Sequence, residues 1–227
     1  MAQTILTIIA LVPALIAAIV FHEVAHGYVA KLLGDPTASE RGRLTLNPIR
    51  HVDPVGTLLV PGALAFFGGP VFGWAKPVPV NHYRLRNPRF GMMAVAAAGP
   101  LSNLLLAAVG AVLLGLLVRA TGMTLAEQDS SLTVLMLSYF LMINVFLALF
   151  NLLPIPPFDG SHIVEGLMPR SMAETWGRLR QLGMLFFIVL IAVTWAFPGS
   201  GIIENVVWPP VEWALGQYYR LAEWVAG

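Results

Sequence analysis

The sequence has no cysteine and few charged residues. Of its 227 residues, 11% are charged and 57% are hydrophobic, whereas an average soluble domain has about 25% charged residues. The absence of cysteine excludes disulfide bonds and thiolate metal sites, so any metal must be held by His, Asp or Glu. The scarcity of charge and the mean hydropathy of +0.76 indicate an integral membrane protein with little soluble mass. The net charge of +1, without a basic stripe, gives no indication of nucleic-acid binding.

Four apolar runs predict membrane-spanning helices. The first covers residues 4–33, and its uncharged stretch from residue 4 to Phe21 is about as long as a membrane span. The run ends at the Gly-Asp-Pro sequence that follows. It lacks the basic segment and the cleavage site of a signal peptide, so we expect a retained span. The others are residues 90–118, 132–153 and 182–197, the last only sixteen residues long. We therefore predict an all-α polytopic membrane protein, a bundle of about four transmembrane helices.

Three further segments have unusual patterns. Residues 42–48 (GRLTLNP) alternate polar and apolar side chains, which predicts a short β-strand. Residues 55–75 are apolar but interrupted by proline and glycine, and we expect a re-entrant segment, because irregular backbone at membrane depth is tolerated only against protein or a wet cavity. Residues 202–219 carry several Trp and Tyr, which is typical of an interfacial segment.

Basic residues are unevenly distributed between the predicted loops. Loop 31–90 contains eight Lys and Arg and loop 154–181 contains three, whereas the opposite side has only Arg119 and Arg220. Cytoplasmic loops carry the excess of basic residues. We therefore expect these two loops in the cytoplasm and both chain ends outside.

Residues 22–26 read HEVAH and continue the first apolar run. His22 and His26 are four residues apart, so on a helix they lie about 40° apart around its axis and can reach one metal ion. Glu23, beside the first histidine, can then hold a water molecule on that metal. Ionisable groups at such a place are costly in a membrane, and they mark a functional site.

A catalytic zinc site typically has three protein ligands and one open position. Asp159 is a candidate third ligand, because the charge distribution places it at the same membrane side as HEVAH. At 1.5 Å per residue, His22 is about 16 Å from the end of its span, so Asp159 can meet it only if the chain after Asn151 stays within the protein. The prolines after Asn151 interrupt a regular helix and leave backbone carbonyls unpaired. These carbonyls need partners inside the protein, which fits a chain that stays within it. His162 is an alternative ligand or a partner of one.

Two other histidines, His51 and His82, lie in polar loops, and we expect them to be solvated at the surface.

Three motifs together resemble the site-2 protease family of intramembrane metalloproteases. They are HEVAH, GPLSN at residues 99–103, and N-x-x-P-x-x-P-x-D-G at residues 151–160. The resemblance covers residues 5–165, and without a PDZ-like or CBS-like insertion it is to the minimal members. It implies one protease domain over residues 1–227, with the catalytic core at 5–165 and a C-terminal span and interfacial segment at 181–220.

The resemblance also implies the chemistry. His22, His26 and Asp159 are expected to bind one Zn²⁺ ion, which activates water and the scissile carbonyl, while Glu23 passes a proton from that water to the leaving amine. Transmembrane segments of other membrane proteins are the expected substrates. The expected location is a prokaryotic inner membrane, with the active site toward the cytoplasm. The strand predicted at residues 42–48 is a candidate to hold an unwound substrate by backbone pairing.

Two asparagines have a functional and a structural interpretation. Asn103 shares a helix face with Gly99 and is predicted at a depth close to that of His22, so it is a candidate to bind substrate or stabilise the oxyanion. Its alternative role is hydrogen bonding between helices. Asn151 is a candidate to contact substrate or to shape the proline turn.

Two other functions compete with proteolysis. A metal transporter or channel would use the histidines to line a path, but the sequence offers one site and no inverted repeat in its hydropathy. An inactive membrane scaffold would have no need of Glu23. The sequence does not specify the substrate or the oligomeric state.

Overall fold

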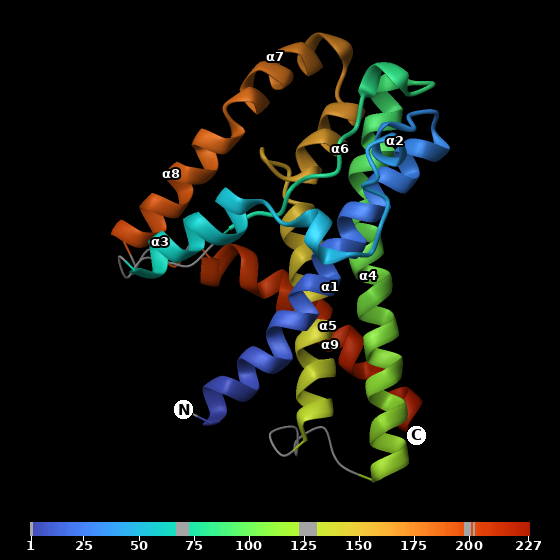
Figure 1. The fold of residues 1–227 in the computed structure, drawn as a ribbon, viewed down its shortest axis with the longest axis vertical. Coiled ribbons are helices and arrows are strands. Elements are labelled where there is room, and N and C mark those ends of the chain that lie inside the picture. The colour runs from blue at the N-terminus through green and yellow to red at the C-terminus, as the bar shows by residue number, and fades with distance from the viewer. Residues whose placement is uncertain (1, 67–72, 123–130, 198–200, 202) are drawn as a thin grey trace. The chain divides into compact units, whose positions relative to one another are not determined.

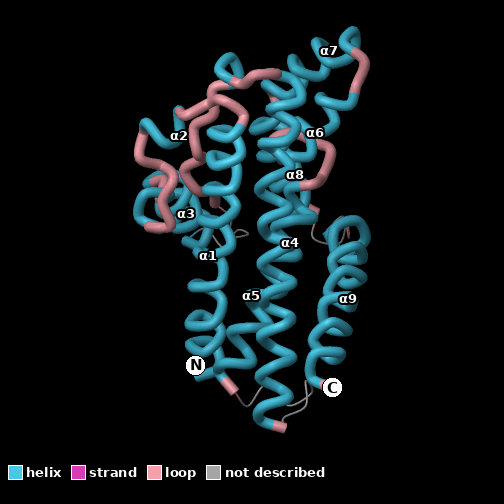
Figure 2. The backbone as a smooth tube through the Cα atoms, turned by 90° about the vertical axis from the view of Figure 1, so that its right-hand side faces the viewer, coloured by secondary structure: helices cyan, strands magenta, loops and turns pink. Residues whose placement is uncertain are grey.

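All regular elements in the computed structural model are helical. It describes residues 2–66, 73–122, 131–197, 201 and 203–227, and no strand is present within these ranges (Figure 2). The chain divides into two compact units. The first comprises residues 1–19, 100–150 and 203–227, and the second comprises residues 20–99 and 151–202. The predicted all-α class is confirmed.

Three of the described helices are long and apolar enough to cross a membrane (Figure 1). They are α1 (Ala2–Leu32), α4 (Pro88–Thr121) and α5 (Leu132–Asn151). The fourth predicted span forms α8 (Gly183–Ala196), which has 14 residues. At 1.5 Å per residue α8 is about 21 Å long, shorter than a hydrocarbon core of about 30 Å. The predicted count of four spans is therefore not confirmed.

The first unit has a core of small and branched residues contributed by α4, α5 and α9 (Trp208–Ala226). A Cβ atom at Gly115 of α4 would collide with the carbonyl oxygen of Ala222 in α9, so the two backbones approach closely. Small residues permit such contacts between membrane helices. One face of α9 is thus buried, whereas Trp213 and Trp224 of the same helix are 70% and 80% exposed. The interfacial position predicted for residues 202–219 stays a prediction.

Short helices make up most of the second unit, together with the second half of α1 and the start of α4. Between these two segments lie α2 (Thr37–Glu40), η1 (Pro48–His51), η2 (Pro54–Leu59), α3 (Val60–Phe66) and η3 (His82–Arg84). After α5 the chain forms α6 (Asp159–Leu167), α7 (Arg170–Gln181) and α8, and it enters α9 of the first unit through η5 (Ile203–Val207).

Asp35 connects the end of α1 to the segment before η3. Its buried carboxylate accepts hydrogen bonds from the amide and hydroxyl groups of Thr37 and, at 2.6 Å, from the amide of Asn81. Burial raises the pKa of Asp35, but these hydrogen bonds outweigh it and hold the pKa below its ordinary value. Asp35 is therefore an ionised anchor between two segments far apart in the sequence.

The strand predicted at residues 42–48 is not confirmed, because residues 43–47 have no regular structure and no paired neighbouring strand. The segment predicted to be re-entrant begins as helices η2 and α3, and residues 67–72 lie outside the described ranges. It returns at Trp74, whose amide donates to the Gly56 carbonyl at 3.1 Å. Gly56 and Trp74, which are near the two ends of this segment, thus lie side by side, and the depth of the segment in a membrane stays a prediction.

His51 corrects one expectation. It is 3% exposed instead of solvated, and its Nε2 lies 2.8 Å from the carbonyl oxygen of Thr45. The cause is the short η1 turn, capped by the Asn47 side chain, which folds His51 back against the preceding segment. His82 is exposed, as predicted.

Candidate metal centre

Helix α1 carries two of the predicted metal ligands on one face. The Nε2 atoms of His22 and His26 lie 3.0 Å apart, as the four-residue spacing predicts. Asp159 comes from the first turn of α6, and its Oδ2 is 3.1 Å from Nε2 of His22 and 3.4 Å from Nε2 of His26. In the described part of the chain, these three residues form the group able to hold a metal ion.

Gly160 explains how Asp159 reaches this position. A Cβ atom at Gly160 would collide with the carbonyl oxygens of Leu152 and Leu153, in the turn that follows α5. Only glycine lets the start of α6 pack this closely on the preceding turn. The Asp-Gly pair is therefore a structural unit in which the glycine allows the approach and the aspartate supplies the candidate ligand.

The three donor atoms fit a zinc ion. Ligand atoms about 2.0–2.1 Å from a tetrahedral metal lie about 3.3 Å from one another, and the observed separations are 3.0, 3.1 and 3.4 Å. The buried Oδ2 of Asp159 has no partner in hydrogen-bonding geometry within the described residues, although both imidazoles are near it. Burial raises the pKa of Asp159, but the two histidines outweigh it and keep the pKa well below its ordinary value. The oxygen is thus an anionic donor that faces two imidazole nitrogens.

The hydrogen bond of His26 fixes which of its nitrogens faces the metal. Its Nδ1 lies 2.6 Å from the carbonyl oxygen of Val95 in α4, and a carbonyl can only accept. Nδ1 therefore carries the proton, and Nε2 presents its lone pair to the site, as a metal ligand requires.

Glu23 is held beside the site by backbone. Its Oε2 accepts a hydrogen bond of 2.7 Å from the amide of Val78, while Oε1 has no hydrogen-bond partner among the described residues. The segments at Leu44 and Val78 approach α1 closely because the next turn has Gly27, where a Cβ atom would be 2.7 Å from both side chains. The carboxylate is thus oriented without being a member of the donor group.

Gly99 is a site residue whose role the sequence did not reveal. A Cβ atom there would lie 2.5 Å from Cε1 and Nε2 of His26 and 2.6 Å from Cε1 of His22. The glycine therefore leaves room for both imidazoles against α4. The signal available was a glycine inside a long helix, which costs about 1 kcal/mol relative to alanine and so calls for a packing reason.

The other predicted site residues are not members of the donor group. Asn103 is fully buried in the first unit, where its amide nitrogen donates to the Ala18 carbonyl at 3.1 Å and to the Asn144 side chain at 2.8 Å. These contacts support its structural interpretation. Asn151 is the last residue of α5. His162 is outside the donor group, and its ring lies against Arg180. A catalytic role for either asparagine stays a prediction.

Comparison with known proteins agrees with this geometry. The model of Peptidase family M50 matches residues 10–193. A Bacillus subtilis (strain 168) protein named "Putative zinc metalloprotease YwhC" is 43% identical over 199 residues, which are 88% of this chain and 84% of that protein. A Mycolicibacterium smegmatis protein named "Putative zinc metalloprotease Rip2" is 28% identical over 82% of this chain and 72% of its own. No solved structure matches significantly. The chain therefore belongs to Peptidase family M50, the site-2 protease family of membrane metalloproteases.

Proposed function

We propose that this protein is an intramembrane zinc endopeptidase that cuts within the transmembrane segments of other membrane proteins. The observation that carries this proposal is the convergence of His22, His26 and Asp159 beside Glu23. Two of the three ligands and the glutamate belong to a helix that is apolar enough to cross a membrane. A peptidase site on such a helix favours substrates that are themselves in the membrane.

The proposed roles follow from the chemistry of each group. The two histidines and Asp159 hold the metal, which when bound supplies Lewis-acid activation of the scissile carbonyl and of water. The Glu23 carboxylate takes one proton from the attacking water as the water oxygen adds to the carbonyl carbon. Glu23 then delivers this proton to the leaving nitrogen as the C–N bond breaks. The Val78 amide holds Oε2, and Oε1 is the oxygen that we propose carries the proton in both transfers.

The segment at residues 43–47 is the proposed binding edge for an extended substrate. The amides of Leu44, Thr45 and Leu46 have no described hydrogen-bond partner, which leaves them available for backbone pairing. Arg43 steadies the segment by donating to the Lys76 carbonyl at 2.8 Å. Segments 43–47 and 76–78 are thus joined beside the turn of α1 that carries Glu23.

Proline at position 46 tests this edge. Leu46→Pro removes one amide donor from an exposed position, and we expect cleavage to fall while the zinc content is unchanged. Leu46→Ala is the matched control, because it shortens the side chain but keeps the amide. Equal cleavage by the two variants would contradict backbone pairing.

The central experiment measures zinc and cleavage in the same preparations. Wild type, Glu23→Gln and Asp159→Asn are purified in mild detergent, their zinc content is measured by mass spectrometry, and each is reconstituted with single-span membrane proteins. We expect Glu23→Gln to keep its zinc and to cleave about 10²–10⁴-fold more slowly, and we expect the wild-type cuts to lie within the apolar segment.

Two outcomes would contradict the proposal. Cuts confined to water-exposed parts of the substrates would show a peptidase that acts outside the membrane. Zinc flux into vesicles that persists in Glu23→Gln would favour a transporter, because transport does not need a general base.

A further inference from the structure

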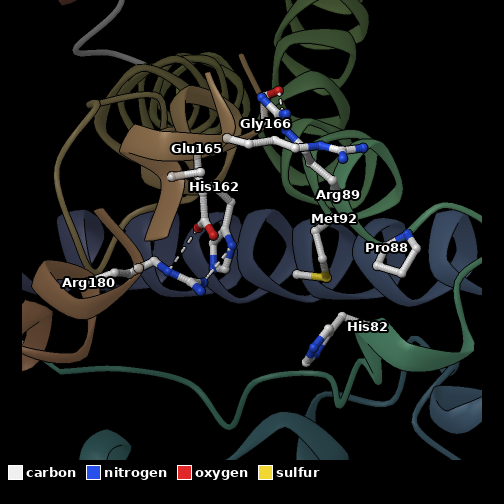
Figure 3. A pocket seen from close by; sticks show the side chains of 11 residues that line it. His82, Pro88, Arg89, Met92, His162, Glu165, Gly166 and Arg180 are labelled. Carbon is white, nitrogen blue, oxygen red and sulfur yellow. Dashed lines mark hydrogen bonds and ion pairs between the residues drawn. The ribbon is translucent and has the colours of Figure 1, made fainter. Parts of the chain in front are cut away.

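The second unit contains a cavity of about 480 Å³ outside the metal centre, with three arginines among its eleven lining residues (Figure 3). Arg89 at the start of α4, Arg170 and Arg180 of α7, and His82 contribute to its wall. Glu165 is the single acidic residue in the lining. The cavity therefore carries a formal charge of +2 from three guanidinium groups and one carboxylate.

Two of the three arginines have partners that hold them in place. Arg180 pairs with Glu165, with Nε 3.1 Å from Oε2, and its Nη1 lies 2.7 Å from the ring nitrogens of His162. Burial and the charge of Arg180 lower the pKa of His162 to about 4, so this ring is neutral near pH 7. The one acidic group is thus already compensated, and the neutral imidazole adds no charge.

Arg89 caps the end of α6. Its Nε donates to the carbonyl of Gly166 at 3.1 Å (Figure 3). Its Nη2 donates to the carbonyl of Met168. Arg170 lies at the first position of α7, is exposed, and has no hydrogen bond or ion pair with any described residue. The cavity therefore combines one fixed cationic group, Arg89, with one that is available to a ligand, Arg170.

The cavity lies at the end of a membrane-spanning helix. Helix α4 has 34 residues and is about 51 Å long, about 20 Å more than a hydrocarbon core of about 30 Å, and the charge of Arg89 in its first turn favours a position for this turn at the lipid headgroups. This turn, with Pro88 and Arg89, forms part of the cavity wall. Basic pockets at such a depth are suited to acidic lipid headgroups.

We propose that this cavity binds a phosphate group and that an anionic phospholipid headgroup is its source. The guanidinium N–H groups can donate hydrogen bonds to phosphate oxygens. The depth of the cavity favours a lipid over a free anion. Such a lipid would contact α4, α6 and α7 together, and α6 is the helix that supplies Asp159.

Retained lipid is the direct measurement. The full chain is reconstituted in phosphatidylcholine nanodiscs containing a minor fraction of phosphatidylglycerol and is then released into mild detergent. Native mass spectrometry counts the phosphatidylglycerol that remains bound. We expect Arg170→Gln to lower the retained fraction about fivefold, since one basic residue near a membrane surface changes binding by about that factor. Arg178→Gln is the matched control, because Arg178 is exposed on the same helix but does not line the cavity.

A second variant keeps every arginine. Ala173→Glu places a carboxylate in the wall of the cavity, and we expect it to lower phosphatidylglycerol retention as well. The zinc content of each variant reports whether the second unit is intact, because none of these residues is in the metal centre. Equal losses in Arg170→Gln and Arg178→Gln, with zinc retained, would overturn the proposal in favour of general surface attraction.

Inorganic phosphate separates the two sources. In detergent without lipid, phosphate is titrated against thermal unfolding of wild type and Arg170→Gln. No stabilisation by phosphate, together with selective retention of phosphatidylglycerol, is the expected result for a headgroup site. Stabilisation of wild type alone by phosphate, without lipid retention, would make free phosphate the source. Absence of both effects would overturn the site.

Discussion

Replacing Gly99 by alanine is the sharpest perturbation of the metal centre, because it adds one methyl group and no charge. Helix propensity alone predicts a gain of about 1 kcal/mol in the free energy of unfolding. The new Cβ atom, however, would lie 2.5 Å from two atoms of the His26 ring and 2.6 Å from Cε1 of His22. Non-bonded carbon atoms in contact lie about 3.5 Å apart, so the rings or α4 must move by about 1 Å.

A displacement of this size is large for a metal site. Metal–ligand distances hold within about 0.2 Å, so both histidines would lose their alignment with Asp159. Moving α4 away instead would stretch the 2.6 Å contact between His26 Nδ1 and the Val95 carbonyl, which fixes the tautomer. Loss of such supporting contacts costs about 10- to 100-fold in metal affinity. We expect at least this loss in Gly99→Ala.

The assay is zinc per chain, measured by mass spectrometry at increasing chelator concentration, with cleavage followed in parallel. Gly216→Ala in α9 is the control, because a Cβ atom there meets nothing within 4 Å, and we expect it to keep its zinc and its activity. Gly99→Ala with wild-type zinc affinity and wild-type cleavage would refute the argument that this glycine makes room for the imidazoles.

Four further predictions concern individual contacts. Asp159→Asn should lose most of its zinc, whereas His162→Ala should keep it, as zinc analysis will show; the reverse would make His162 the third ligand. Gly160→Ala should unfold at lower temperature and bind less zinc, because its methyl group would push the start of α6 away from the carbonyls of Leu152 and Leu153. Asn103→Ala should lower the free energy of unfolding by about 1–3 kcal/mol through its lost hydrogen bonds. A fall in turnover of about 10²–10³-fold would instead indicate an oxyanion role. Asp35→Asn should cost about 2 kcal/mol at neutral pH. Because the folded pKa of Asp35 lies below the unfolded value, its contribution is present above about pH 4 and is lost as the pH falls through the folded pKa, so the variant should show a flatter acid limb in thermal unfolding.

Local patterns were sufficient for the features that depend on neighbours in the sequence. Three of the four predicted spans correspond to α1, α4 and α5, because length and apolar composition decide whether a helix can cross a membrane. The run at residues 182–197, which is only sixteen residues long in the sequence, forms the 14-residue helix α8 and is shorter than a span. The strand predicted at residues 42–48 depended on alternation, and a strand also requires a paired neighbour, which no local pattern supplies.

Histidine environments illustrate the limit of sequence reasoning. His51 and His82 both follow polar residues, yet His51 is 3% exposed and His82 is exposed. The difference arises because η1 folds His51 onto the Thr45 carbonyl, a contact that depends on the path of the loop. The polarity of the flanking residues therefore predicted the exposure of His82 correctly but that of His51 wrongly.

The sequence by itself determined the membrane class and the face shared by His22 and His26, because composition and a four-residue spacing act through the helix alone. It also made Asp159 a candidate metal ligand, through a motif. Only the tertiary structure decided that Oδ2 of Asp159 lies 3.1 Å from His22, that Val95 fixes the tautomer of His26, and that Gly99 leaves room for both rings. These features join residues tens of positions apart, and their geometry is set by packing between elements, which local periodicity does not encode.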